Sequence, residues 1–107
     1  MKIELTARHY EASDRVKRYV DAEVNKLEKI HSKIVNCRVI LNRSKEGEMA
    51  EINLHISGKD FVISETSGDI IKSIDLAVTK MERQLKRFKG KRYSNARVIN
   101  SRENLQG

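Results

Sequence analysis

The spacing of apolar residues changes along the chain, and this change constrains the fold more than any other feature. Residues 2–8 alternate, with Ile3, Leu5 and Ala7 on one side and polar residues on the other, which is typical of a half-buried strand. Over residues 14–32 the spacing lengthens to three and four. It predicts an amphipathic helix of about five turns, with apolar residues Val16, Val20, Val24, Leu27 and Ile30.

Three further strands are predicted in the middle of the chain. Residues 34–43 are rich in β-branched side chains, and the segment 44–47 that follows contains a glycine, as hairpin loops often do. Alternation then resumes over residues 48–57. A second tight turn is expected at 58–60, and a shorter fourth strand begins at Phe61.

A second helix is predicted from about Asp69 to Lys89, capped by the segment 66–69 and ended by Gly90. Residues 93–107 are polar and without a period, so we expect a domain over residues 1–92 followed by a flexible polar tail. The apolar set of this helix recurs at steps of three and four and comprises Ile70, Ile74, Ala77, Met81, Leu85 and Phe88.

The element order is therefore β-α-β-β-β-α. A right-handed crossover makes the first two strands parallel, and short turns make the remaining neighbours antiparallel. Strands with a single apolar face need cover on one side only. We expect an α+β two-layer sandwich, in which both helices pack on one face of a four-stranded mixed sheet and the other face is polar.

Positive charge is concentrated in the predicted helices. The chain holds 22 Lys and Arg against 15 Asp and Glu, a net charge of +7. Residues 13–33 carry +2 and residues 69–92 carry +5, whereas the strand block 34–68 carries −1. An excess of this kind favours a polyanionic partner, usually nucleic acid.

Within each helix the basic residues fall on one stripe opposite the apolar face, and the acidic residues fall off it. Two helices side by side would set these stripes together as one basic surface about 30 Å long. A solvated polar face without a partner is the alternative, although such a face usually interleaves the two signs. The stripe residues are Arg15, Arg18, Lys26, Lys29 and Lys33 on the first helix, and Lys72, Lys80, Arg83 and Arg87, with Lys86 beside them, on the second.

The stripes favour contacts with phosphates and recognition of shape. They contain no Asn or Gln to read base edges, and the strands present no exposed aromatic residues for stacking on bases. A double-stranded-RNA-binding domain has a similar α-β-β-β-α order. It differs at the start of its second helix, where a lysine cluster replaces Gly68-Asp69 of this chain.

Residues 1–92 resemble the bacterial ribosome hibernation-promoting factor / ribosome-associated inhibitor A family. One departure is Ile71, where the family often has tyrosine, so a stacking role is not carried over to that position. The resemblance lies in the combination of motifs at these spacings: Lys26-Leu27-Glu28-Lys29, Asp69-Ile70 followed by Ser73-Ile74-Asp75, and Lys80-Met81-Glu82-Arg83-Gln84-Leu85-Lys86.

The resemblance implies a non-catalytic, cytoplasmic stress factor that occupies the mRNA and tRNA channel of the small ribosomal subunit and inhibits translation. It implies no cofactor, metal, membrane or small-molecule substrate, and a monomer off the ribosome. The expected rRNA contacts carried over by position are Lys26, Lys29, Lys80, Arg83, Lys86, Arg87, Lys89, Lys91 and Arg92. The stripe argument alone adds Arg15, Arg18, Lys33 and Lys72 at lower rank.

Residues able to do chemistry are few. His9, His31 and His55 lack the spacing of metal ligands, and Cys37 alternates with apolar neighbours as a core residue does. No nucleophile and base, phosphate loop or nucleotide motif is present. The alternatives left open are a structured-RNA-binding domain outside the ribosome, a basic adaptor for an acidic protein and an RNA-cleaving enzyme.

Overall fold

The structure is a computed structural model that describes residues 1–97. Its strands form one sheet in the order β1-β2-β3-β4, in which β1 and β2 are parallel and the other neighbours are antiparallel. The predicted element order and mixed sheet are confirmed. The elements are β1 (Lys2–Arg8), α1 (Asp14–Ile30), β2 (Ile34–Ser44), β3 (Gly47–Ile56), β4 (Lys59–Ser67) and α2 (Ile70–Arg97).

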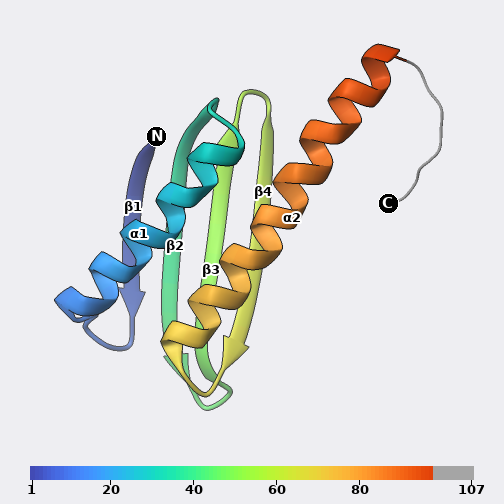
Figure 1. Cartoon of the computed structure of the whole chain (residues 1–107). Helices are drawn as coiled ribbons and strands as arrows, with labels where there is room; N and C mark the ends of the chain where they lie inside the picture. Colours follow the sequence, from blue (N-terminus) through green and yellow to red (C-terminus); the bar gives the residue numbers. More distant parts are fainter. Residues whose placement is uncertain (98–107) are drawn as a thin grey trace.

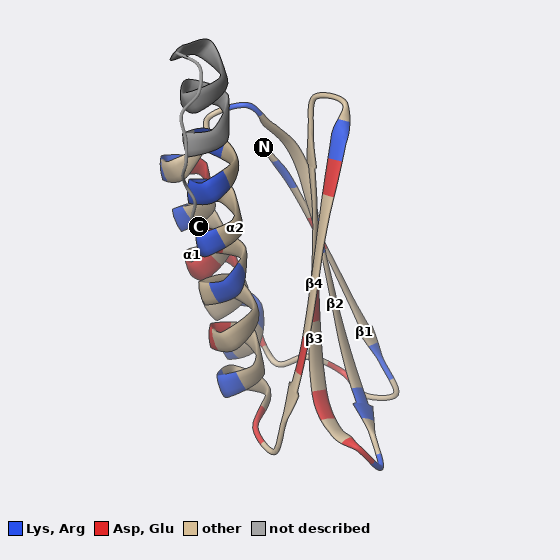
Figure 2. Ribbon diagram, turned by 90° about the vertical axis from the view of Figure 1, so that its right-hand side faces the viewer, with Lys and Arg blue, Asp and Glu red and all other residues tan. Residues whose placement is uncertain are grey.

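Both helices cover the same face of the sheet, as predicted, so the molecule has two layers (Figure 2). Figure 1 shows α1 over the β1 side of the sheet and α2 running diagonally across β3 and β4. The core lies between the layers because alternate strand residues and one face of each helix point inward. The largest side chains buried there include Leu27, Leu41, Ile52, Leu54, Ile56, Ile74, Met81 and Leu85.

The first helix begins as predicted and ends two residues earlier. The Ser13 hydroxyl accepts a hydrogen bond from the Val16 amide at 3.2 Å, which caps the N-terminus. The last helical residue is Ile30, and the amide of His31 donates to the Leu27 carbonyl at 3.1 Å.

Two-residue turns join the antiparallel strands, and a glycine lies within the second turn and directly after the first. Gly47 has φ +130°, and a Cβ there would lie 2.7 Å from the Ser67 carbonyl oxygen. Gly58 has φ +76°, which favours glycine in a hairpin turn. The pairing of β3 with β4 extends from Ile56↔Lys59 to Glu48↔Ser67, so β4 is longer than predicted.

The second helix continues past its predicted end, so the prediction that Gly90 stops it is wrong. A single glycine weakens a helix by only about 1 kcal/mol relative to alanine and need not end it. Of the predicted tail, residues 93–97 are helical, whereas residues 98–107 lie outside the described part of the chain. The apolar pattern also missed Val78 and Ser73, which are both buried.

The outer face of the sheet is mainly polar, and two exposed valines interrupt it. Val62 is 55% exposed and Val35 is 54% exposed, the latter at an irregularity in the pairing of β2 with β3. His55 pairs with Asp60 across β3 and β4 at 2.5 Å. On β3, Glu51 accepts a hydrogen bond from the Asn53 side chain at 2.9 Å.

Candidate nucleic-acid interface

The two helices lie side by side and are joined by polar contacts as well as by the core. The Tyr19 hydroxyl of α1 donates a short hydrogen bond to the Asp75 carboxylate of α2. The Lys89 ammonium group donates a hydrogen bond to the Ile30 carbonyl at 3.3 Å. This carbonyl belongs to the last turn of α1, where carbonyl groups have no partner within the helix. Both helices therefore lie on the same side of the sheet, and many Lys and Arg positions fall on them (Figure 2).

The basic residues of α1 are exposed. Arg15, Arg18 and Lys29 lie on the helix, and Lys33 follows in the connection to β2. Among the described residues none of these four forms an ion pair. Their charges are therefore available to a partner, unlike that of Lys26, whose ammonium group lies 2.8 Å from the Glu23 carboxylate.

The basic residues of α2 divide in the same way. Within the described part of the chain, Lys72, Arg83, Lys86 and Arg87 are exposed and form no ion pair. Lys80 is bound at 2.6 Å to Glu65, a half-buried carboxylate on β4. Two further predicted contacts, Lys91 and Arg92, belong to the helical segment that follows Lys89.

Acidic residues of both helices surround Lys26, the member of the first stripe that faces α2, so the prediction of one uninterrupted basic surface is wrong. The acidic seam, as we name it, consists of Glu23 and Lys26 from α1 with Asp75 and Glu82 from α2. It holds three carboxylates and one ammonium group, a net charge of −2. Sequence spacing separated the acids from each stripe but did not show that both helices turn their acids toward each other.

The pKa shifts in this seam follow from its contacts. The hydrogen bond from Lys26 to Glu23, together with the charges of Glu23, Glu82 and Asp75, raises the pKa of the Lys26 ammonium group. The hydrogen bond to Asp75, with some desolvation, raises the pKa of Tyr19 to about 12. Both groups therefore keep their protons at neutral pH, which preserves the contacts between the helices.

An aromatic cluster attaches the C-terminal half of α2 to the rest of the fold. Phe88 lies edge-on to Phe61 of β4, with ring centroids 5.2 Å apart, and stacks on His31 at 5.8 Å. The Lys59 ammonium group lies 5.5 Å from the Phe61 ring and 5.7 Å from the Phe88 ring. The apolar period of the second helix predicted a buried face that includes Phe88, but it did not indicate His31 as a neighbour. The cluster positions Lys86, Arg87 and Lys89.

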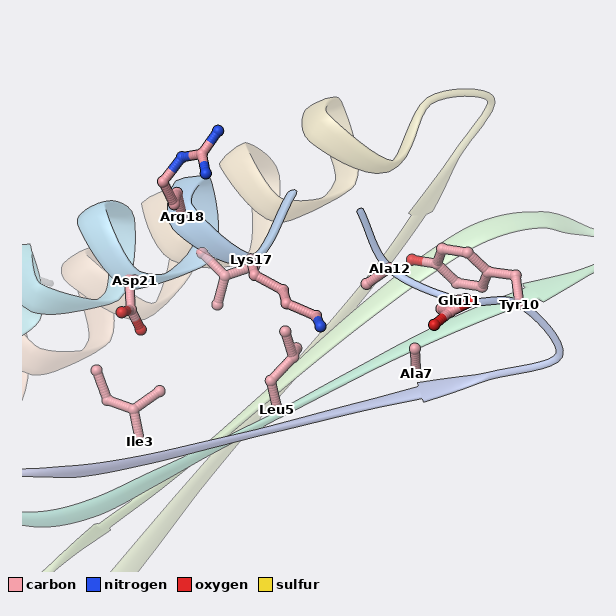
Figure 3. Close-up of a pocket in the computed structure, with 10 residues that line it drawn as sticks. Ile3, Leu5, Ala7, Tyr10, Glu11, Ala12, Lys17, Arg18 and Asp21 are labelled. Atoms are coloured by element: carbon pink, nitrogen blue, oxygen red, sulfur yellow. The ribbon is translucent and has the colours of Figure 1, made fainter. Parts of the chain in front are cut away.

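A groove of about 500 Å³ lies between α1 and the edge strand β1 (Figure 3). Ile3, Leu5 and Ala7 form its apolar floor, and charged residues from the chain around the start of α1 stand at its rim. The rim carries both signs, with Lys17 and Arg18 opposed by acidic neighbours. The groove therefore does not extend the basic surface, although Arg18 borders both.

No group of three or more His, Cys, Asp or Glu side chains suited to a metal ion occurs in residues that the structure describes. Cys37 is fully buried, and desolvation raises the pKa of its thiol to about 12. Neither described helix has an apolar stretch long enough to cross a bilayer.

The fold and its charge define a class of protein: a two-layer α+β domain whose helices carry two basic stripes on its outer surface. Residues 3–93 match the family described as sigma 54 modulation protein / S30EA ribosomal protein, and the chain belongs to this family. The family resemblance found in the sequence is thereby confirmed.

Individual relatives are similar over nearly their whole length. The chain is 29% identical over 91 residues to a ribosome hibernation promoting factor of Azotobacter vinelandii, covering 85% of each protein. It is 30% identical over 94 residues to a ribosome hibernation promoting factor of Pseudomonas putida, covering 88% of this chain and 92% of the relative. The N-terminal domain of Thermus thermophilus Protein Y superposes with a TM-score of 0.76 at 29% identity, covering 82% of this chain and 99% of that domain.

Proposed function

We propose that this protein is a non-catalytic ribosome hibernation factor that binds the small ribosomal subunit and blocks translation by occupying the mRNA and tRNA channel. The observation that carries the proposal is the group of exposed cations on the two helices that form no ion pair among the residues the structure describes. The names of its relatives, which are ribosome hibernation promoting factors, support a ribosomal partner for that face. The domain over residues 1–92 would be the ribosome-binding unit.

The proposed contacts are with RNA phosphates. Lys and Arg side chains that form no ion pair in the described structure need no partner to be displaced before they bind a phosphate. On this basis Arg83, Lys86 and Arg87 rank first, and Lys29 follows. Lys26 and Lys80 must first loosen their bonds to Glu23 and Glu65. The remaining proposed contacts are Lys89, Lys91 and Arg92 beyond them on α2, and Arg15, Arg18, Lys33 and Lys72 from the stripes.

The first test neutralises three cations on α2 with Arg83→Gln, Lys86→Gln and Arg87→Gln. Glutamine keeps helix propensity while removing the charge, so we expect an intact fold. Affinity for purified small subunits should fall at least about tenfold, and the dependence of affinity on salt should become shallower, because fewer counterions are released on binding. Co-sedimentation across a salt series measures both quantities.

A matched control removes the same charge from the sheet side with Lys2→Gln, Arg8→Gln and Lys45→Gln. These residues are exposed and belong to β1 or to the turn between β2 and β3, outside both helices. The control should bind small subunits nearly as well as the unmodified protein. Equal losses in the two triple variants would show that only net charge matters and would refute the proposed surface.

Channel occupancy is tested by competition. Small subunits preloaded with mRNA and a P-site tRNA should bind this protein much more weakly than vacant subunits, because the ligands would need the same space. Co-sedimentation of labelled protein with both kinds of subunit gives the comparison. Equal binding to preloaded and vacant subunits would place the protein outside the channel.

A further inference from the structure

The acidic seam separates the two groups of cations that the proposed function requires. On one side are the exposed cations of α1, such as Arg18 and Lys29. On the other are Arg83 and Lys86 of α2. Between them lie Glu23, Lys26, Asp75 and Glu82, with a net charge of −2. The positive surface is therefore two tracks with a negative strip between them.

The contacts of the seam hold this negative strip in place. Asp75 accepts the hydrogen bond from Tyr19, and Glu23 is only 16% exposed and bound to Lys26. Glu82 is half-buried and lies close enough to Lys26 to raise its pKa. Lys26 is thus bound to Glu23 and attracted by the charges of Glu82 and Asp75, so it must leave Glu23 before it can bind a phosphate over the seam.

We propose that the acidic seam divides the helical surface into two phosphate-binding tracks, so that the protein selects folded RNA that presents two backbone segments over a single extended strand. The inference rests on the proposed function, since it names the kind of RNA that the basic face accepts. It assigns a specificity role to Glu23, Asp75 and Glu82, which discriminate by repulsion.

Distances between packed helices explain why the seam matters. Axes of packed helices are about 8–10 Å apart, so a strand lying lengthwise between α1 and α2 would place its phosphates directly over the seam. The Debye length at physiological salt is about 8 Å, so the seam carboxylates would act on such phosphates without full screening. Two backbone segments on the outer flanks of the seam would contact cations and avoid the carboxylates. Repulsion at the centre therefore favours the folded partner.

The test combines Glu23→Gln with Glu82→Gln. The double substitution brings the net charge of the seam from −2 to zero and keeps the hydrogen bond between Tyr19 and Asp75. The probes are poly(U), as a single strand, and a short RNA hairpin with a fully paired stem. Affinity for poly(U) should rise about twofold, the effect at physiological salt of removing two unit charges roughly 8 Å, about one Debye length, from a phosphate in a water-like dielectric. Affinity for the hairpin should rise less, so the ratio of hairpin to poly(U) affinity should fall.

A matched control makes the same change in net charge on the sheet, with Glu4→Gln and Glu51→Gln. It should leave the ratio of affinities unchanged. The inference is overturned if the seam variant leaves the ratio unchanged, or if the control lowers it equally.

The outcome is separable from that of the proposed function. Small-subunit binding by the unmodified protein tests the function, whereas the ratio between two RNA probes tests the seam. A protein that binds small subunits but shows no seam effect would retain the proposed function and refute the division into two tracks. A seam effect without subunit binding would indicate selection of folded RNA outside the ribosome.

Discussion

Single residues decide how the two helices meet. Tyr19 and Asp75 are polar residues at the margin of apolar faces, and spacing alone assigned neither of them a partner. The fold brings them together across the 56 residues that separate them in the sequence. The bond orients α1 on α2, and it also fixes one carboxylate of the acidic seam. A contact of this kind depends on the packing of two elements, so it cannot be predicted from the period of either one.

Replacing Tyr19 with phenylalanine should lower the free energy of unfolding by about 1 kcal/mol at neutral pH, because Asp75 loses its donor. The pKa of Tyr19 is raised from 10.0 to about 12, so the folded state holds this proton more tightly than the unfolded state. The stabilisation is therefore complete below pH 10 and is lost as the pH rises toward 12. Urea unfolding of both proteins at neutral pH, with an ultraviolet titration of tyrosinate, measures the two effects. Equal stability, or a titration near 12 that persists in the variant, would contradict this role.

Secondary-structure elements were predicted well where an apolar face is buried. The limits of β1 and the first residue of α1 agree with the structure, since strong periodicity and a serine cap define them. The ends of elements without such signals were predicted less well. β4 is extended by pairing with β3, and α2 continues through Gly90, because hydrogen bonding along an existing strand or helix outweighs a weak local signal.

The substitution Gly90→Ala distinguishes the observed helix from the predicted stop. Within a continuous helix alanine is preferred over glycine by about 1 kcal/mol, so the variant should show equal or greater helicity and a higher melting temperature. Far-UV circular dichroism during thermal unfolding provides both values. At a helix end in the left-handed conformation alanine would be unfavourable, and a lower melting temperature would therefore support the stop.

At the scale of the whole molecule, the sequence was sufficient to predict the two layers, the pairing of the strands and the single face of the sheet that both helices cover. It was insufficient for the detail of that surface. The helical period shows which residues point away from the core, but the charges that face each other depend on the rotation of α1 against α2. That rotation is set by packing, and it turns Glu23 toward Asp75 and Glu82. The resulting strip of negative charge changes the expected single basic surface into two tracks.

The account depends most on the claim that the helical layer, and not the sheet, faces the ribosome. Lysine acetylation followed by mass spectrometry tests this claim directly, when free protein is compared with protein bound to small subunits. Lys29, Lys72 and Lys86 on the helices should become protected on binding, while Lys2 and Lys45 on the sheet side should react as before. Protection of the two sheet-side lysines, with the helical lysines still reactive, would contradict the account.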